Sequence, residues 1–504
     1  MSRCVQELQI ELGELAIADI QLDIRSRDDI PQILRGLQYI YTTPTVRHAI
    51  FALLEKQVAP HVSHTNGRPG MALWKLLVMG ILRLDLNCDY DRLLELVNHH
   101  DTLRQMLGHA ERFDKYEYSL QTLKDNVSLL TPQLLEEINQ IVVNAGHALV
   151  KKKGDEVLRG RCDSFVVETD VHFPTDITLL WDATRKVIQL TARLSEQHGY
   201  SDWRQYQYNL KQVKRLMRIA QQKKRGKATS ETQTQQKNAA IAQAHENYLT
   251  LAQTYLNKAR KTVSQINLAE LTLKDRALIE SITTFGAHAD RQIEQIQRRV
   301  LQGETIASHE KVYSLFEPHT EWIMKGKAGV PVELGVRICI LEDQHQFILH
   351  HQVMEKQTDD HVAVTMVTEA KKQFASLSSC SFDKGFHSPE NQQKLREQLN
   401  VVALPRKGKL SHAAREAEHT DDFIKARRKH SAVESAINAL EVHGLDVCPD
   451  RGIEGFKRYV ALAVVARNVH RIGTLLKQQE QKRAARREHR DRDRDRGSTF
   501  KLAA

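Results

Sequence analysis

Apolar residues recur at three- and four-residue spacing along most of residues 36–150, which is the spacing of amphipathic helices. The segments that show it most clearly are TVRHAIFALLEKQV, MALWKLLVMGILRL, DYDRLLELVNHHDTLRQML and TPQLLEEINQIVVNAGHALVKK. Asp89 and Asp101 stand where N-caps are expected. After a short lead-in at residues 1–35, the pattern predicts an all-helical N-terminal region. It fits both a compact DNA-binding domain and a scaffold.

The second half of the chain mixes helical spacing with the strict alternation that is typical of strands. Residues 161–171 predict an opening strand, and VELGVRICILED alternates with Val336, Ile338 and Ile340 on one face. QFILHHQVME, LSSCSFDKGF and NVVALPRKGKL predict further strands, and DDFIKARRKHSAVESAINALEV and FKRYVALAVVARNVHRIGTLLKQ predict two long closing helices. This order predicts an α/β fold for residues 160–475, in which helices pack on a mixed sheet.

A helical insertion at about residues 195–310 interrupts the α/β region. Within it, residues 201–300 contain no proline, and 18 Lys and Arg against 8 Asp and Glu give a net charge of +10, equal to that of the whole chain. We expect a long helical hairpin that turns within QQKKRGKATSETQTQQK. It is either a solvated spacer or a basic arm that lies along DNA phosphates. Residues 476–504 have low complexity and are expected to form a disordered charged tail.

Charge and composition favour a polyanionic partner. The chain of 504 residues carries a formal net charge of +10, with a pI of about 9.1, which favours nucleic acid over a membrane surface. The sequence contains no apolar run of the ~18–20 residues that a membrane span needs. Its six cysteines are scattered without a CxxC pair, a pattern typical of a reduced, cytoplasmic protein. The length predicts two or three domains.

Three acids stand where an apolar element presents a single carboxylate. Asp163 begins the strand CDSFVVE, Asp383 follows the strand LSSCSF, and Glu434 lies within the helix RRKHSAVESAINAL. Carboxylates held together repel one another unless a cation neutralises them. All-oxygen ligands suit Mg²⁺ or Mn²⁺, and two such ions can activate water or a 3′-hydroxyl for phosphodiester displacement. Taken singly, the same acids also fit a strand-entry cap, a turn aspartate and a helix-surface acid.

Several long blocks in one order carry more information than the three acids alone. They are CDSFVVETDVHFPTDITLLWDATR, SLFEPHTEWIMKGKAGVPVELG, SFDKGFHSPENQQKLREQLNVVALPRKGK and KHSAVESAINALEVHGLDVCPDRGIEGFKRYVALAVVARNVHRIG. Together with the GRPG loop and its neighbouring helices, they resemble bacterial DDE insertion-sequence transposases of the ISNCY type, over residues 45–125 and 160–475. The resemblance implies an RNase H-like catalytic domain, binding of the element's terminal repeats and of target DNA, and Mg²⁺-dependent cleavage and strand transfer.

The acidic blocks of the family can be carried over position by position. CDSFVVE, FDKGF and AVESAIN match them, which implies that Asp163, Asp383 and Glu434 are the catalytic residues and the ligands of two Mg²⁺ or Mn²⁺ ions. Many relatives have an arginine four residues before the glutamate and a lysine seven residues after it. Those positions are His430 and Glu441 here, so the phosphate contacts of these cations are not carried over.

The implied partner is double-stranded DNA bound by a homodimer, with no membrane and no small-molecule cofactor. The basic residues expected to contact DNA are Arg68, Lys211, Lys214, Arg215, Arg218, Lys325, Lys327, Arg406 and Lys407. Two alternatives stay open. One is a two-metal nuclease that cuts DNA without joining strands, and the other is a DNA-binding transposase derivative without catalysis.

Overall fold

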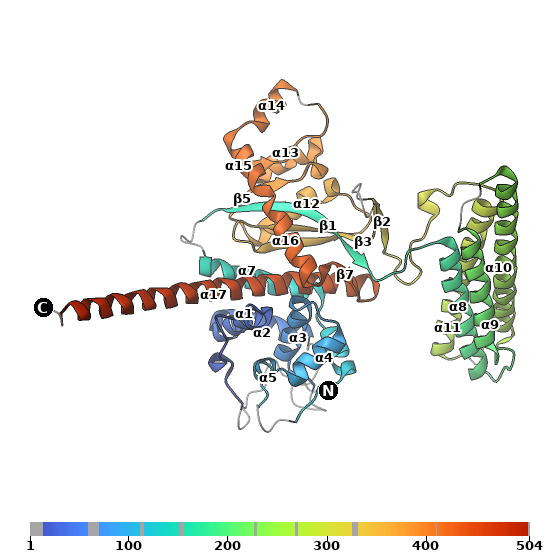
Figure 1. The fold of residues 1–504 in the computed structure, drawn as a ribbon, viewed down its shortest axis with the longest axis horizontal. Helices are drawn as coiled ribbons and strands as arrows, with labels where there is room; N and C mark the ends of the chain where they lie inside the picture. The colour runs from blue at the N-terminus through green and yellow to red at the C-terminus, as the bar shows by residue number, and fades with distance from the viewer. Residues whose placement is uncertain are drawn as a thin grey trace. The chain divides into compact units, whose positions relative to one another are not determined.

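The computed structural model describes residues 14–58, 70–110, 115–150, 156–225, 229–267, 271–324, 331–409 and 411–501. Its contacts divide the chain into two compact units. The sheet unit consists of Met1–Asp170 and Ile323–Ala504, and the helical insertion consists of Val171–Trp322. The fold is of the mixed α/β class (Figure 1). Across the described ranges, no helix is both long enough and apolar enough to cross a membrane.

In the described residues, a mixed sheet of seven strands forms the centre of the sheet unit (Figure 1). The strands are β1 (Leu158–Thr169), β2 (Glu321–Met324), β3 (Val332–Glu342), β4 (Ile348–Met354), β5 (Leu377–Phe382), β6 (Val401–Ala403) and β7 (Val447–Cys448). β1 is central: it runs antiparallel to β3 and parallel to β5 and β7. β4 extends the antiparallel half beyond β3, and β6 extends the parallel half beyond β5.

The alternating segments form strands as predicted, although the first boundary is shifted. The opening strand, expected at residues 161–171, runs from Leu158 to Thr169, so Asp163 lies within the strand and not at its start. The reason is that pairing with β5 already begins at Leu158. In β3, the side chains of Val336, Ile338 and Ile340 are buried, as their alternation predicts.

Helices cover the sheet and connect its strands. They are α12 (Asp359–Gln373), α13 (Pro389–Gln398), α14 (His412–Glu418), α15 (Asp421–His430) and α16 (Ala432–Leu440), with the short turns η5 (Lys384–Phe386) and η6 (Glu441–Leu445). α12 packs on β3 and β4, and α16 packs on β1. The first of the two long closing helices predicted from the sequence is interrupted at Ser431. The break lets α15 contact β5 and β6 while α16 contacts β1.

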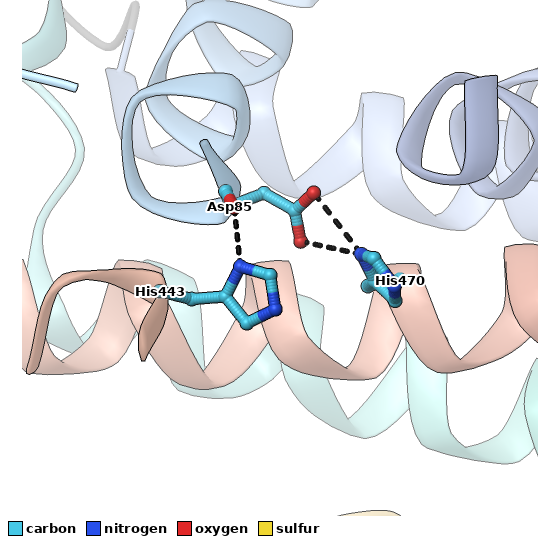
Figure 2. A group of neighbouring side chains, drawn as sticks. All are labelled: Asp85, His443 and His470. Atoms are coloured by element: carbon cyan, nitrogen blue, oxygen red, sulfur yellow. Dashed lines mark hydrogen bonds and ion pairs between the residues drawn. The ribbon is translucent and has the colours of Figure 1, made fainter. Parts of the chain in front are cut away.

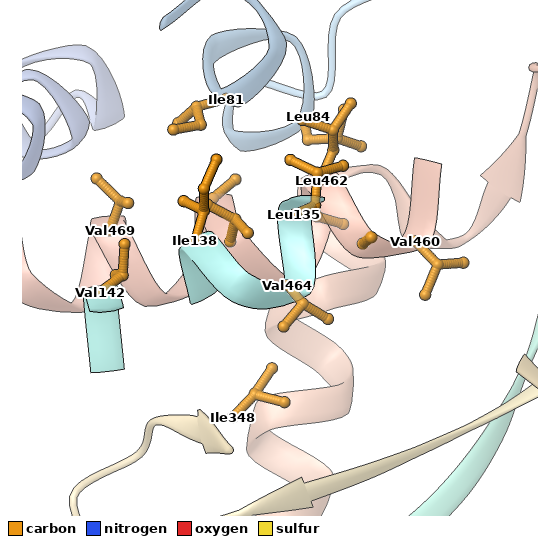
Figure 3. Packing of buried hydrophobic residues seen from close by; sticks show 14 of the residues in the cluster. Ile81, Leu84, Leu135, Ile138, Val142, Ile348, Val460, Leu462, Val464 and Val469 are labelled. Carbon is orange, nitrogen blue, oxygen red and sulfur yellow. The ribbon is translucent and has the colours of Figure 1, made fainter. Parts of the chain in front are cut away.

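Helices precede the sheet, as predicted. They are α1 (Asp29–Thr42), α2 (Pro44–Val58), α3 (Leu73–Asp85), α4 (Tyr90–His99), α5 (Asp101–Met106), α6 (Leu120–Val127) and α7 (Pro132–Val150), after the turn η1 (Ile17–Asp19). α17 (Gly452–Lys501) packs against α1, α3 and α7, and α7 and α17 both contact β4 of the sheet (Figure 1). Figure 3 shows part of the shared core, to which Leu84 of α3, Leu135 of α7 and Leu462 of α17 contribute. α1 and α17 are so close that a Cβ at Gly473 would lie 1.9 Å from a backbone oxygen of α1.

Local boundaries agree with the sequence in part. Asp89 is the N-cap of α4, and its carboxylate accepts a backbone hydrogen bond at 2.7 Å, as expected. Asp101 is not the N-cap of α5, because His100 fills that position and caps the helix with its ring. Only this one residue separates α4 from α5. The charged segment that follows residue 476 continues α17 as a helix to Lys501.

Among its described residues, the helical insertion contains four long helices around a core of its own. They are α8 (Asp176–Gln197), α9 (Tyr206–Lys223), α10 (Glu231–Gln265) and α11 (Leu273–Ile296), followed by η3 (Gln297–Leu301) and η4 (Ser308–Glu310). The predicted hairpin corresponds to α9 and α10, which are joined within the predicted turn segment. α8 forms where PTDITLLWDATRKVIQLTARL predicts a helix after Pro174, but the prediction missed the separate helix α11. Because a hairpin alone would leave apolar stripes exposed, α8 packs against all three other helices.

Candidate active site

The parallel pairing of β1 with β5 brings two of the predicted acids to one place. Cys162 of β1 is the partner of Phe382, the last residue of β5. The next residues along these strands, Asp163 and Asp383, therefore follow at the same level of the sheet. Asp163 points to the face opposite that of Cys162, because side chains alternate along a strand. The Asp163 side chain is half-buried, and Asp383, just beyond the strand end, is exposed.

α16 supplies the third predicted acid. Glu434 lies in the first turn of this helix and is exposed, whereas Val433 and Ala436 are buried and pack the helix against the sheet unit. Contacts between α16 and β1 hold the helix next to the strand that carries Asp163. The three acids thus come from a central strand, from the end of its parallel neighbour, and from a helix packed on that strand.

The electrostatics of Asp163 reflect its acidic surroundings. Its pKa is raised to about 6, mainly by burial and further by the negative charges of Asp383, Asp359 and Glu434. A hydrogen bond of 2.8 Å from the Ser164 amide opposes the rise. All three predicted acids therefore belong to one group of interacting charges. Their donor set is oxygen only, and a bound cation would relieve the repulsion, so these residues fit Mg²⁺ or Mn²⁺.

Asp359 is a fourth acid in this group, and the sequence reasoning missed it. It lies in the first turn of α12, and its Oδ1 accepts a hydrogen bond of 2.6 Å from the Ser164 hydroxyl on β1. A Cβ at Gly385, two residues after Asp383, would lie 2.7 Å from Asp359 Oδ2, so the absence of a side chain there makes room for the carboxylate. In the sequence, an acid at a helix start signals only a favourable dipole interaction.

His430 occupies the position where many relatives carry arginine. Its ring Nδ1 lies 3.1 Å from the hydroxyl of Ser381 in β5. Burial lowers the pKa of His430; the charges of Asp383 and Glu434 oppose this shift, and that of Arg161 adds to it. The imidazole is therefore neutral at neutral pH, and it contacts the strand that leads to Asp383 without adding a positive charge.

Basic side chains stand beside the second acid. Lys407 donates from its Nζ to the Gly385 carbonyl at 2.9 Å. Arg406 and Arg396 line two adjoining hollows of about 510 and 390 Å³ next to α13. Sequence reasoning named Arg406 and Lys407 but missed Arg396, which lies on an otherwise ordinary polar helix. Glu397, Glu418 and Asp422 line the same hollows, so this edge carries charges of both signs.

The remaining predicted DNA contacts fall into two groups. Lys211, Lys214, Arg215 and Arg218 are all exposed on α9, whereas Leu210, Val213 and Met217 of the same helix are buried. Arg68, Lys325 and Lys327 lie outside the described residues. Of the cations near the Glu434 helix, Lys457 pairs with Glu355 at 2.6 Å, and Arg427 and Arg428 are exposed at the end of α15.

Comparisons with protein-family models, with curated proteins and with solved structures found no match to this chain. The functional interpretation therefore rests on the geometry of the acidic group and on the motif blocks of the sequence. The acids are chemically suited to bind divalent cations. Exposed lysines and arginines occur both beside this group and, within the helical insertion, along α9.

Proposed function

We propose that the chain is a DDE-type DNA transposase, which binds the ends of its insertion sequence and catalyses Mg²⁺-dependent cleavage and strand transfer. The observation that carries the proposal is the single charge group formed by Asp163, Asp383 and Glu434. These are the acids at which the sequence blocks match the acidic motifs of the family. The proposed substrate is double-stranded DNA, bound by a homodimer in the cytoplasm.

The strand arrangement supports an RNase H-like interpretation of the sheet unit. β1, β3 and β4 form an antiparallel half in chain order, and β5 and β6 continue the sheet in parallel on the other side of β1. α12 connects the two halves, and α16 brings the last acid back to β1. Such a mixed sheet, with one acid on a central strand, one just beyond the end of the neighbouring strand and one on a packed helix, is what the family resemblance implies.

Each side chain of the site has a definite part in the proposed reaction. Asp163, Asp383 and Glu434 would hold two Mg²⁺ ions, which supply the Lewis acidity that activates water or a 3′-hydroxyl and stabilises the leaving oxygen. Because the pKa of Asp163 is about 6, its ionised, ligating form dominates above that pH. Ser164 holds Asp359 in place. The neutral imidazole of His430 does not compete with cations for the acids.

The test is cleavage and joining of DNA that carries the element ends, with variants that keep shape but remove charge. Asp163→Asn, Asp383→Asn and Glu434→Gln are each expected to abolish cleavage in Mg²⁺ and to leave DNA binding largely intact. Asp170→Asn, an exposed acid just beyond β1, is the matched control and should cleave normally. Normal cleavage by any of the first three variants would exclude that residue from the site.

The same assay separates the alternatives. A wild-type chain that cuts the element ends but never joins the 3′-hydroxyl to target DNA is a two-metal nuclease. A chain that binds the ends and cleaves in neither Mg²⁺ nor Mn²⁺ is a DNA-binding derivative without catalysis. Only cleavage followed by strand transfer agrees with the proposal.

A further inference from the structure

A second group of metal-binding side chains lies where the N-terminal helices meet α17 and η6. It consists of Asp85 at the end of α3, His443 in η6 and His470 in α17 (Figure 2). One ligand atom from each, a carboxylate oxygen and two ring nitrogens, lies within 4.8 Å of the others. Asp85 and His470 are buried and His443 is half-buried. Neither the acidic group nor the proposed reaction uses these residues.

We propose that Asp85, His443 and His470 bind a divalent transition-metal ion, and that zinc is the ion their chemistry fits best. Two imidazole nitrogens and one carboxylate oxygen are typical ligands of zinc, whereas Mg²⁺ and Ca²⁺ prefer oxygen alone. This donor set therefore discriminates against the ion expected at the acidic group. Three protein ligands leave the fourth tetrahedral position to a water molecule.

The distances place the ligands near a coordination sphere. His470 Nδ1 donates to the two carboxylate oxygens of Asp85 at 3.0 and 3.1 Å, and an ion bound at Nδ1 would replace this proton. Ligands at ~2.0–2.1 Å from a tetrahedral ion stand roughly 3.3 Å from one another. The rings of His443 and His470 have their centroids 5.2 Å apart. Because the ligand atoms lie within 4.8 Å of one another, a side-chain shift of about 1–2 Å would bring them to the spacing of one coordination sphere.

A hydrogen bond also prepares His443 for this role. Its Nδ1 lies against the backbone carbonyl of Asp85 (Figure 2), so Nδ1 donates a proton and Nε2 keeps its lone pair. Metal-binding histidines commonly donate their other ring nitrogen to a carbonyl in this way, which selects the tautomer that can ligate.

The surrounding backbone is held so that the ligands are presented in advance. Asn87 Nδ2 donates to the Val442 carbonyl at 3.2 Å, and the Tyr459 hydroxyl donates to the Gly444 carbonyl at 3.0 Å. Gly444 has φ +103°, a conformation that favours glycine, and it lets the chain turn directly after His443. Because η6 follows α16 without a gap, an ion at this site would tie α3 to the end of the helix that carries Glu434.

The experiment measures zinc binding by the full-length chain. After removal of metals with a chelator, the protein is titrated with Zn²⁺ in excess Mg²⁺ by calorimetry, and bound zinc is counted by elemental analysis. Asp163→Asn is included so that the acidic group does not contribute. One equivalent is expected in the wild type and in Asp163→Asn. His443→Ala and His470→Ala are each expected to bind at least tenfold more weakly.

The control is His99→Ala, which removes an exposed histidine of α4 and should bind zinc as the wild type does.

Cobalt in place of zinc should give visible d–d absorption without a thiolate band, and this absorption should be lost in His443→Ala. Zinc should raise the melting temperature of the wild type by roughly 5 °C, but not that of His443→Ala.

Two results would overturn the proposal. The first is a wild-type chain that binds no zinc in the presence of Mg²⁺, which would leave the three side chains as a hydrogen-bonded contact only. The second is unchanged zinc affinity in both histidine variants. If His470→Ala does not fold, two measurements still decide the question. They are the zinc affinity of His443→Ala, whose side chain is half-buried in the wild type, and the zinc content of the wild type. None of these measurements depends on DNA cleavage, so the outcome is independent of the proposed function.

Discussion

The exposed basic face of α9 gives the most quantitative expectation for DNA binding. The four cations are Lys211, Lys214, Arg215 and Arg218, and replacing all four by glutamine keeps their helical positions while removing their charge. Because the apolar side of α9 is buried in the core of the helical insertion, the substitutions leave that packing intact. Lys214 also stands over the ring of Trp181, 5.8 Å from its centroid, so the melting temperature of the variant is compared with that of the wild type before a loss of affinity is assigned to charge.

The magnitude follows from counterion release. Each phosphate neutralised by a cation contributes ~0.9 to the slope of log affinity against log salt concentration. Four contacts thus contribute about 3.6, and the quadruple variant is expected to have a slope flatter by ~3–4. When the salt concentration rises from 50 to 200 mM, both proteins bind DNA more weakly. The factor by which the wild type loses affinity should be about 150 times the factor for the variant.

The assay is fluorescence anisotropy of labelled duplexes, with and without the element ends, over a series of salt concentrations. Binding should weaken on both duplexes, because phosphate contacts carry no sequence information. The single variants Arg215→Gln and Arg260→Gln form a matched pair. Arg215 should account for about 0.9 of the slope, and Arg260, whose guanidinium pairs with Asp290, for clearly less.

An unchanged slope in the quadruple variant would refute the phosphate-binding arm. Light scattering on the same variant tests the competing explanation, in which α9 packs against a second protomer and its cations stay solvated. In that case the oligomeric state would change and the salt dependence would not.

Three further outcomes are expected. Burial and neighbouring charges raise the pKa of Asp163 from 3.8 to about 6, so stability that is present below pH ~4 is lost as the pH rises through ~6. Asp163→Asn should therefore stabilise the metal-free chain by about 1–3 kcal/mol at pH 7.5 and should have no such effect at pH 4. A variant less stable than the wild type at pH 7.5 would contradict this. Gly473→Ala forces a Cβ against the α1 backbone and should lower the free energy of unfolding, measured by urea denaturation, by at least about 2 kcal/mol. The control is Gly286→Ala, whose Cβ would have its nearest neighbour at 4.0 Å; it should leave the free energy of unfolding unchanged or raise it by up to ~1 kcal/mol. Gly385→Ala should displace the Asp359 carboxylate and slow cleavage by ~10–100-fold with DNA binding retained, and wild-type cleavage would show that Asp359 does not position the site.

Local patterns in the sequence determined the elements of this chain to a large extent. Apolar spacing is enough to place α3, α7 and α9, because a helix must bury one continuous stripe. Alternation is enough to place β3, whose inward residues Val336, Ile338 and Ile340 are all buried. Asp89 at the start of α4 is a local cap and needs no distant partner. The basic character of the insertion is likewise a property of composition, and it does not depend on how the four helices pack.

Tertiary structure alone decided which residues meet. Asp163 and Asp383 are 220 positions apart, and only the parallel register of β1 with β5 sets them at one level. In the sequence, Asp359 looks like an ordinary acid at a helix start. It lies with the other acids of the site because the first turn of α12 reaches Ser164. Asp85 gains its histidine neighbours from two elements more than 350 positions away in the chain. These contacts between distant residues depend on strand order and helix packing, which are set by the whole core. The periodicity of the sequence shows only which side of each element is apolar.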